Sequence, residues 1–364
     1  MYHVDTSEQP VVLIWEVTQA CGLSCDHCRA DAQPDRHPDE LSTAEGKRLL
    51  EDAAAFGEGQ LVVLSGGDPL VRDDIAELVA YGDGLGLRMT MTPSGTRSLS
   101  TERIEALADA GLKRIAVSLD GAAAESHDAF RGETGSFAET IRAVEDARDA
   151  GIPVQVNTTV CRETVGELPA IRSLVSELGA VLWSVFFLVP IGRGRVLEAI
   201  DPAEADAVMR WLAAVADEEP FGLKTTEAPH YRRVVAQRSA NEASDAGGDG
   251  SKGGRTGVIA GDGFAFVSHT GEVYPSGFLP QSVGSVREQP VHELYREAPL
   301  FRELRDRDAL EGKCGACPYR TICGGSRSRA YAHTGDPLAS DPLCPYVPPG
   351  YDGPLPWESS SPTA

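Results

Sequence analysis

Lysine and long apolar runs are both scarce in this chain. Only five of its 33 basic residues are lysine, and 55 acidic residues give a formal net charge of −22 over 364 residues. Such a charge repels nucleic acid and anionic membranes, so we expect neither as a partner. No apolar run reaches the roughly 18 residues of a membrane-spanning helix, and the N-terminus lacks the basic and apolar regions of a signal peptide. A cytoplasmic protein is therefore expected.

The acidic residues are spread over segments that otherwise have the pattern of a folded protein. Together with the use of arginine in place of lysine, this distribution indicates a halophilic protein and not an acidic interaction tail. In about 1 M salt the Debye length is about 3 Å, so the net charge would hardly oppose an anionic substrate. Local arginines would then decide whether such a substrate binds.

Cysteine is sparse but clustered. Seven of the eight cysteines lie in two groups, which in a reducing compartment indicates metal ligation and not a disulfide framework. The remaining one, Cys161, follows the alternating stretch 154–160. We expect it to be a small hydrophobic residue near a strand end.

The first group has three cysteines, Cys21, Cys25 and Cys28, in the run CGLSCDHC after an apolar stretch. Four-iron clusters are normally held by four thiolates, so a loop with three leaves one iron open to a substrate or cosubstrate. A zinc site, or a disulfide with a spare thiol, is the alternative. Zinc usually takes four ligands, and His27 lies between two of the cysteines, where it cannot easily ligate with them.

The second group has four cysteines spaced Cys-x2-Cys-x5-Cys with a distant fourth. They are Cys314, Cys317, Cys323 and Cys344. Four thiolates make a closed site, which fits either an iron-sulfur cluster without an open iron or a structural zinc. The spacing alone does not exclude zinc.

Short β-rich runs alternate with helical periodicity over the first 220 residues. The strand candidates are 11–17, 60–64, 88–92, 114–119, 153–160 and 181–188. The helix candidates are 42–55, 73–81, 101–110, 137–150, 167–178 and 202–216. This alternation predicts an α/β fold with a parallel sheet and right-handed crossovers. Functional residues are expected on the loops after the carboxyl ends of the strands.

The rest of the chain is divided by composition. The Gly-rich segment 241–256 predicts a flexible linker after a first domain over 1–240. An alternating stretch at 263–275 predicts a β-hairpin that turns at Thr270-Gly271 and begins a second domain, 257–346. The Pro-, Gly- and Ser-rich residues 347–364 are expected to form a loosely attached, disordered tail.

The pattern Cys-x3-Cys-x2-Cys after a first strand resembles the radical S-adenosylmethionine (SAM) superfamily. The resemblance implies an open (β/α)6 partial TIM barrel and a [4Fe-4S] cluster held by Cys21, Cys25 and Cys28. It implies that SAM chelates the open iron and is cleaved to a 5′-deoxyadenosyl radical that abstracts hydrogen from the substrate.

The run from Cys314 to Gly325 resembles the SPASM or twitch extension of that superfamily. This implies an auxiliary [4Fe-4S] cluster in the second domain. Many SPASM proteins have cysteine where this chain has Ser276. We therefore expect one auxiliary cluster and not two.

Gly66, Gly67 and Asp68, after the second strand, resemble the Gly-Gly-Glu-Pro motif of the superfamily, with a shorter carboxylate arm. The resemblance implies contact with the methionyl amino group of SAM. Paired glycines let a backbone approach a ligand closely. In isolation the same residues would be an ordinary turn.

Further SAM contacts are implied by the same resemblance. Ser118 and Arg131 would meet the ribose and the carboxylate, to which arginine can donate bidentately. Ser94 and Asn157 are weaker candidates, and Gly192 would permit close approach to the adenine. Each polar residue could instead cap a helix or satisfy a strand end.

Four arginines are candidate contacts for carboxylates on a substrate. They are Arg193, Arg195, Arg327 and Arg329. Surface salt bridges in an acid-rich protein are the alternative explanation for them.

Most of the chain resembles the haem-biosynthesis branch of radical SAM/SPASM proteins. The residues concerned are 189–194 (VPIGRG), 271–275 (GEVYP), 323–332, Gly335-Asp336 and Cys344. The resemblance implies removal of acetate or propionate carbons from an iron porphyrinoid, a tetrapyrrole, in haem or haem d1 biosynthesis. A ferredoxin or flavodoxin would supply electrons.

Two other functions stay open. SPASM proteins also modify ribosomal peptides, although no obvious peptide-recognition module precedes Val11. A non-catalytic metal scaffold is the second alternative. The intact three-cysteine motif and Gly66-Gly67 argue against a scaffold, because it has no need of an open iron.

Overall fold

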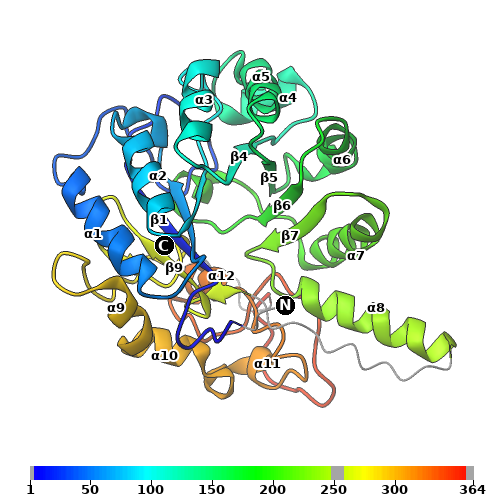
Figure 1. The fold of residues 1–364 in the computed structure, drawn as a ribbon. Coiled ribbons are helices and arrows are strands. Elements are labelled where there is room, and N and C mark those ends of the chain that lie inside the picture. The colour runs from blue at the N-terminus through cyan, green and yellow to red at the C-terminus, as the bar shows by residue number, and fades with distance from the viewer. Residues whose placement is uncertain (1–3, 247–257, 358–364) are drawn as a thin grey trace.

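One curved sheet forms the centre of the protein, and helices surround its outer face (Figure 1). The computed structural model describes residues 4–246 and 258–357. Within them, seven strands run parallel and neighbour one another in sequence order. They are β1 (Val12–Glu16), β2 (Leu61–Ser65), β3 (Arg88–Met91), β4 (Arg114–Ser118), β5 (Val154–Val160), β6 (Leu182–Phe187) and β7 (Gly222–Thr226). The predicted partial barrel is confirmed, with one strand beyond the six expected.

Helices connect these strands and cover the outside of the sheet. They are α1 (Thr43–Ala54), α2 (Ile75–Gly84), α3 (Thr101–Asp109), α4 (Ala124–Arg131), α5 (Ser136–Asp149), α6 (Leu168–Glu177) and α7 (Pro202–Glu218). Ser100 caps α3 by accepting a hydrogen bond from the Arg103 amide. Among the described residues, no helix combines the length and apolarity needed to cross a membrane.

The two faces of the sheet differ because alternate residues of a strand point to opposite sides. On the outer face, a Cβ at Gly46 of α1 would collide with the Trp15 ring, so the helix approaches only because that residue is glycine. Trp183 lies against a tryptophan of α7, with ring centroids 6.0 Å apart. The inner face carries polar side chains such as Ser184 and Thr226, whose hydroxyl oxygens are 3.3 Å apart. The inner face is therefore the more polar of the two.

The predicted hairpin is present, but it extends the barrel sheet. β9 (Gly263–Val267) and β10 (Val273–Tyr274) are antiparallel, and the turn between them places Gly271 at a φ of +93°. The other edge of β9 lies parallel to β1, with Ile14 opposite Phe266, and β8 (Ile259–Ala260) also pairs with β9. The boundary expected near residue 257 is therefore not a boundary of the sheet, because β9 covers the edge of β1 that β2 leaves open.

The two segments expected to be flexible also differ from prediction. α8 (Tyr231–Ala246) runs into the predicted linker, whose remaining residues lie outside the described part. The tail packs onto the second half of the chain as far as Trp357, whose ring centroid lies 4.0 Å from Lys313 Nζ. This cation–π contact attaches residues that composition alone marked as loose. Between the hairpin and the tail lie α9 (Val291–Glu297), α10 (Pro299–Arg305), α11 (Gly312–Gly315) and α12 (Arg327–Thr334).

Candidate active site

The three cysteines of the first group lie on the loop that follows β1. Backbone N–H groups donate to two of the sulfurs, from Leu23 to Cys21 at 3.3 Å and from Ala32 to Cys28 at 3.5 Å. Burial raises the pKa of the Cys25 thiol to about 11, and the charges of the two neighbouring cysteines add to this effect. Thiolates that repel one another in this way are stabilised when a metal replaces their protons. The loop therefore fits a metal cluster.

Arg131, the last residue of α4, is buried beside these cysteines. Burial lowers its pKa, but the charges of the three thiolates and of Asp120 outweigh that effect and raise the pKa. Nη1 of Arg131 lies 3.4 Å from Asp120 Oδ2 and 3.3 Å from His27 Nε2. Its Nε is buried without a hydrogen-bond partner among the described residues. A free guanidinium donor in this place fits a carboxylate, as predicted for SAM.

Asp120 and His27 were not predicted as site residues. Asp120 follows β4 and accepts a hydrogen bond from the Thr159 amide at 2.7 Å, which ties Arg131 to the sheet. His27 stacks on Phe130 with ring centroids 4.7 Å apart, and burial lowers its pKa to about 4. His27 is therefore neutral near pH 7 and can accept from Arg131. The sequence could have indicated Asp120 as a site residue, because it comes directly after a predicted strand.

The glycine pair after β2 packs closely on the backbone of the cysteine loop. A Cβ on Gly66 would collide with the carbonyl oxygen of Thr18, and one on Gly67 with that of Ala20. The amides of Gly67 and Asp68 donate to the same two oxygens, at 2.9 and 2.7 Å. The glycines thus let this loop pack against the start of the cysteine loop. Contact of this loop with the SAM amino group stays a prediction.

Asp68 and Ser94 join the loops after β2 and β3 to the cysteine loop. Asp68 is buried and accepts a hydrogen bond from Ser98 Oγ at 2.8 Å. Ser94 Oγ donates to the Gly67 carbonyl at 2.9 Å and lies 3.2 Å from Cys21 Sγ. The structure therefore brings both residues to the cluster loop, while their contacts with SAM stay predictions.

Ser118 and Asn157 lie opposite each other on β4 and β5. Asn157 Oδ1 accepts from Gln155 Nε2 at 2.7 Å, which fixes the orientation of the amide. The Ser118 hydroxyl has no hydrogen bond to another residue in the described ranges. It remains available to a ligand on the inner face, as predicted for the ribose of SAM.

Gly192, in the turn after β6, also packs on the cysteine loop. Its φ is +53°, and a Cβ there would collide with the carbonyl oxygens of Cys28 and Arg29. The next amide, of Arg193, donates to the Cys28 carbonyl at 3.0 Å. Glycine therefore permits a close approach to the backbone of the cysteine loop, and contact with the adenine stays a prediction.

The side chain of Arg193 holds the same loop. Its Nε donates to the Cys25 carbonyl at 3.0 Å and its Nη1 to the Ala32 carbonyl at 2.9 Å. Its Nη2 is buried without a hydrogen-bond partner among the described residues, and the predicted substrate contact stays a prediction. Arg195, two residues later, is exposed and has no polar contact with another described residue.

The four cysteines of the second group surround one pocket. They are Cys314, Cys317, Cys323 and Cys344. Burial raises the pKa of Cys323 and, to about 11, that of Cys344. Across 4–246 and 258–357, no three His, Cys, Asp or Glu side chains are placed to hold one metal ion. Four thiols that line one pocket can together hold the auxiliary four-iron cluster that the SPASM resemblance implies.

Arg327 was expected to meet substrate or lie on the surface; burial rules out the surface position, and the substrate contact stays a prediction. It is fully buried and donates from Nη1 to the carbonyls of Pro337 and Ala339, both at 2.8 Å. Its Nη2 lies 3.7 Å from Cys314 Sγ. Arg327 therefore shapes the loops around the second cysteine group.

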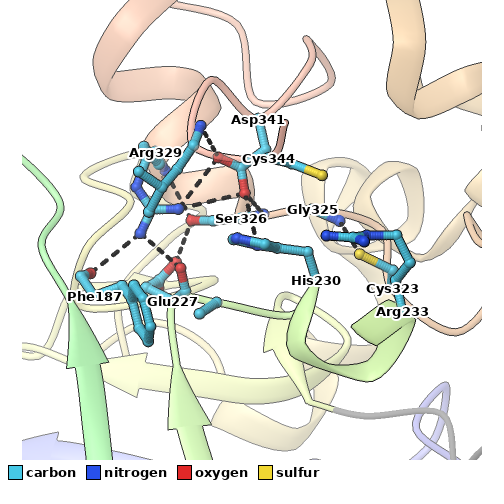
Figure 2. Close-up of polar contacts among 12 residues, drawn as sticks. Phe187, Glu227, His230, Arg233, Cys323, Gly325, Ser326, Arg329, Asp341 and Cys344 are labelled. Carbon is cyan, nitrogen blue, oxygen red and sulfur yellow. Dashed lines mark hydrogen bonds and ion pairs between the residues drawn. The ribbon is translucent and has the colours of Figure 1, made fainter. Parts of the chain in front are cut away.

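Arg329 is also buried and therefore does not lie on the surface; its contact with substrate stays a prediction. Its Nη2 donates to the carbonyls of Phe187 at 3.1 Å and Glu227 at 2.6 Å, and its Nη1 pairs with Asp341 at 3.2 Å (Figure 2). Burial raises the pKa of Asp341, but Arg329 and other partners lower it to about 2 overall. Arg329 thus connects the ends of β6 and β7 to the segment that carries the second cysteine group.

Glu227, directly after β7, is the other connection at this junction (Figure 2). Its carboxylate accepts from the hydroxyls of Ser328 at 2.9 Å, Ser276 at 3.3 Å and Ser326. Ser276 therefore acts as a hydrogen-bond donor where many SPASM proteins have cysteine. This use supports the expectation of a single auxiliary cluster.

Cys161, buried against Phe130, is the small hydrophobic residue that was expected.

Known proteins resemble this chain over nearly its whole length. Residues 15–175 match the model of the radical SAM superfamily. An AdoMet-dependent heme synthase from Methanosarcina barkeri is 42% identical, over 93% of this chain and 97% of that protein. A pre-heme d1 synthase from Dinoroseobacter shibae is 32% identical, over 92% and 85%. Mycofactocin maturase MftC from Mycobacterium ulcerans is 32% identical, over 93% and 88%.

A solved structure shares the fold. The crystal structure of Streptococcus suis SuiB bound to S-adenosylmethionine superposes with a TM-score of 0.72 at 16% identity, covering 93% of this chain and 78% of that one. The chain therefore belongs to the radical SAM superfamily, whose enzymes use a [4Fe-4S] cluster and SAM, and groups with its haem-biosynthesis branch.

Proposed function

We propose that this protein forms haem or a haem precursor by removing side-chain carbons, as carboxyl groups, from an iron porphyrinoid. The observation that carries the proposal is the three-cysteine loop packed on Arg131, whose Nε is buried and free. The loop occurs in a chain 42% identical to a relative named AdoMet-dependent heme synthase. When bound, the cluster and SAM supply a 5′-deoxyadenosyl radical.

Each residue of the site would have a separate role in this reaction. Cys21, Cys25 and Cys28 would hold the cluster, and Arg131 would orient the SAM carboxylate through its free Nε. Ser118 offers a hydroxyl to the ribose. Asp120 and the neutral His27 hold the Arg131 guanidinium in position, so that the SAM carboxylate meets a donor that is already oriented.

The pocket lined by the second cysteine group would hold an auxiliary [4Fe-4S] cluster. Three cationic side chains, Arg233, Lys313 and Arg320, share that pocket and would offset the negative charge of a four-thiolate cluster. A cytoplasmic ferredoxin or flavodoxin would deliver electrons, because the enzyme needs a low-potential donor to reduce the first cluster.

The test is turnover by the anaerobically reconstituted enzyme with SAM, reductant and an iron porphyrin that carries four propionates. The expected result is loss of carboxyl carbon from the porphyrin, detected by mass spectrometry, with formation of 5′-deoxyadenosine. A variant with alanine at Cys21, Cys25 and Cys28 is the control and should form neither product. An unmodified porphyrin beside a modified ribosomal peptide would favour the peptide-maturase alternative.

A further inference from the structure

Three basic residues lie on the inner face of the sheet, outside the site described above. Arg88 begins β3, Arg114 begins β4 and Lys224 lies in the middle of β7. Their neighbours along the strands, such as Met89 and Ile115, are buried in the outer core. Because side chains alternate between faces, the three cations project from the concave side. Thr226, two residues after Lys224, confirms this side by its contact with Ser184.

None of these three cations has an acidic partner. Within the described residues, their side chains make no hydrogen bond or ion pair, although 55 carboxylates are present in the chain. Elsewhere arginines pair readily, as Arg142 does with Glu139 at 3.0 Å and Asp146 at 2.6 Å. Arg88 and Lys224 are exposed and Arg114 is partly buried, so an anionic ligand can reach all three and balance their charge.

The three cations also lie close enough to affect one another. Burial lowers the pKa of Arg114, and the charge of Arg88 lowers it further. Burial likewise lowers the pKa of Lys224 to about 8, with a further contribution from Arg114. Solvent nevertheless reaches the Lys224 side chain, which is exposed. The three cations therefore lie on the same concave face, within electrostatic reach of a neighbour and open to a ligand.

We infer that Arg88, Arg114 and Lys224 form a carboxylate subsite on the inner face of the barrel, which binds a side-chain carboxylate of the substrate. The inference rests on the proposed function, because an iron porphyrinoid offers several carboxylates while only one can react at a time. Two guanidinium groups and an ammonium match the geometry and charge of such a group. Arg88 and Arg114 lie at the amino ends of β3 and β4, and Lys224 lies in the middle of β7, so the subsite would hold the carboxylate that reaches deepest into the barrel.

The test measures how tightly the reconstituted protein binds an iron porphyrin with four propionates. Binding is measured anaerobically from the change in the visible absorbance of the porphyrin. The double variant R114Q/K224Q should bind it roughly 10- to 100-fold more weakly, since a hydrogen bond to a charged group is worth about 1.5–3 kcal/mol. The tetra-amide of the same porphyrin should bind the double variant and the wild type equally. Lys224→Arg should retain the affinity for the tetrapropionate.

The matched control is Arg48→Gln, which removes an exposed charge from the outer helix α1. It should bind as the wild type does. Circular dichroism and iron content check that each variant is folded and loaded. Equal affinity of R114Q/K224Q and wild type for the tetrapropionate would overturn the subsite. Absence of porphyrin binding by the wild type would instead overturn the proposed function, so the two failures are distinguishable.

Discussion

Replacing Arg193 by glutamine should release the cysteine loop and destabilise the first cluster. The wild-type guanidinium makes two hydrogen bonds to loop carbonyls, at 3.0 and 2.9 Å. A hydrogen bond from a charged donor is worth about 1.5–3 kcal/mol when buried. The side chain is 27% exposed, so water can replace part of that energy. We therefore expect the free energy that favours the closed loop over the open loop to fall by about 2–3 kcal/mol.

That loss converts to a roughly 30- to 150-fold larger population of the open loop. Iron should leave the first cluster faster by about the same factor when an iron chelator is added anaerobically, provided that the loop opens and closes quickly. The assay follows the electron paramagnetic resonance signal that changes when SAM is added, because only the first cluster responds to SAM. Arg195→Gln, a change in the same turn at an exposed side chain, is the control and should lose iron at the wild-type rate.

An opposite result would refute the reasoning. If Arg193→Gln loses iron no faster than the wild type but binds the porphyrin more weakly, Arg193 contacts substrate and is not a clamp. If Arg195→Gln loses iron as fast as Arg193→Gln, the effect comes from the charge of the turn and not from the two hydrogen bonds.

Four further outcomes are expected. Raising the pH from about 7 to 9 should weaken tetrapropionate binding, because Lys224, with its pKa lowered to about 8, loses its charge, whereas Lys224→Arg should bind equally at both pH values. Iron analysis should give about eight irons per chain, and about four irons with one zinc would contradict the auxiliary cluster. Gly67→Ala should lose the first cluster selectively, since its Cβ meets the Ala20 carbonyl, and retention of SAM cleavage would argue against this packing. Thermal unfolding should move to higher temperature in about 2 M KCl as the net charge of −22 is screened, and an unchanged midpoint would contradict halophilic adaptation.

Much of the barrel could be predicted because its signals are local. The six expected strands and six expected helices agree with the structure to within a few residues, since apolar runs, caps and terminal glycines mark their ends. α4 lacked such a signal, because Ala123 at its start provides no side-chain cap. β7 was missed because its sequence, GLKTT, is polar, which follows from the placement of Lys224 and Thr226 on the inner face.

The roles of individual site residues were harder to predict, because they depend on segments far away in the sequence. Arg193 and Arg329 look like surface residues in an acidic chain, yet carbonyl groups from distant loops surround both. Gly67 was expected to make room for a ligand, and its neighbour is the backbone of Ala20. The cysteines could be recognised from spacing alone, because thiolate chemistry and not tertiary context makes them conspicuous.

The pairing of β9 with β1 has a consequence for how the chain is made. Glu16 at the end of β1 and His269 after β9 are 253 positions apart, with Glu16 Oε1 2.8 Å from His269 Nδ1. Most of the protein must therefore be synthesised after β1 has left the ribosome before β9 is available to pair with it. Until then the nascent barrel presents an unpaired edge, which is prone to pair with other chains. Expression of the first 240 residues alone should for this reason give aggregated material, and early chaperone binding to the nascent chain is expected to favour the native product.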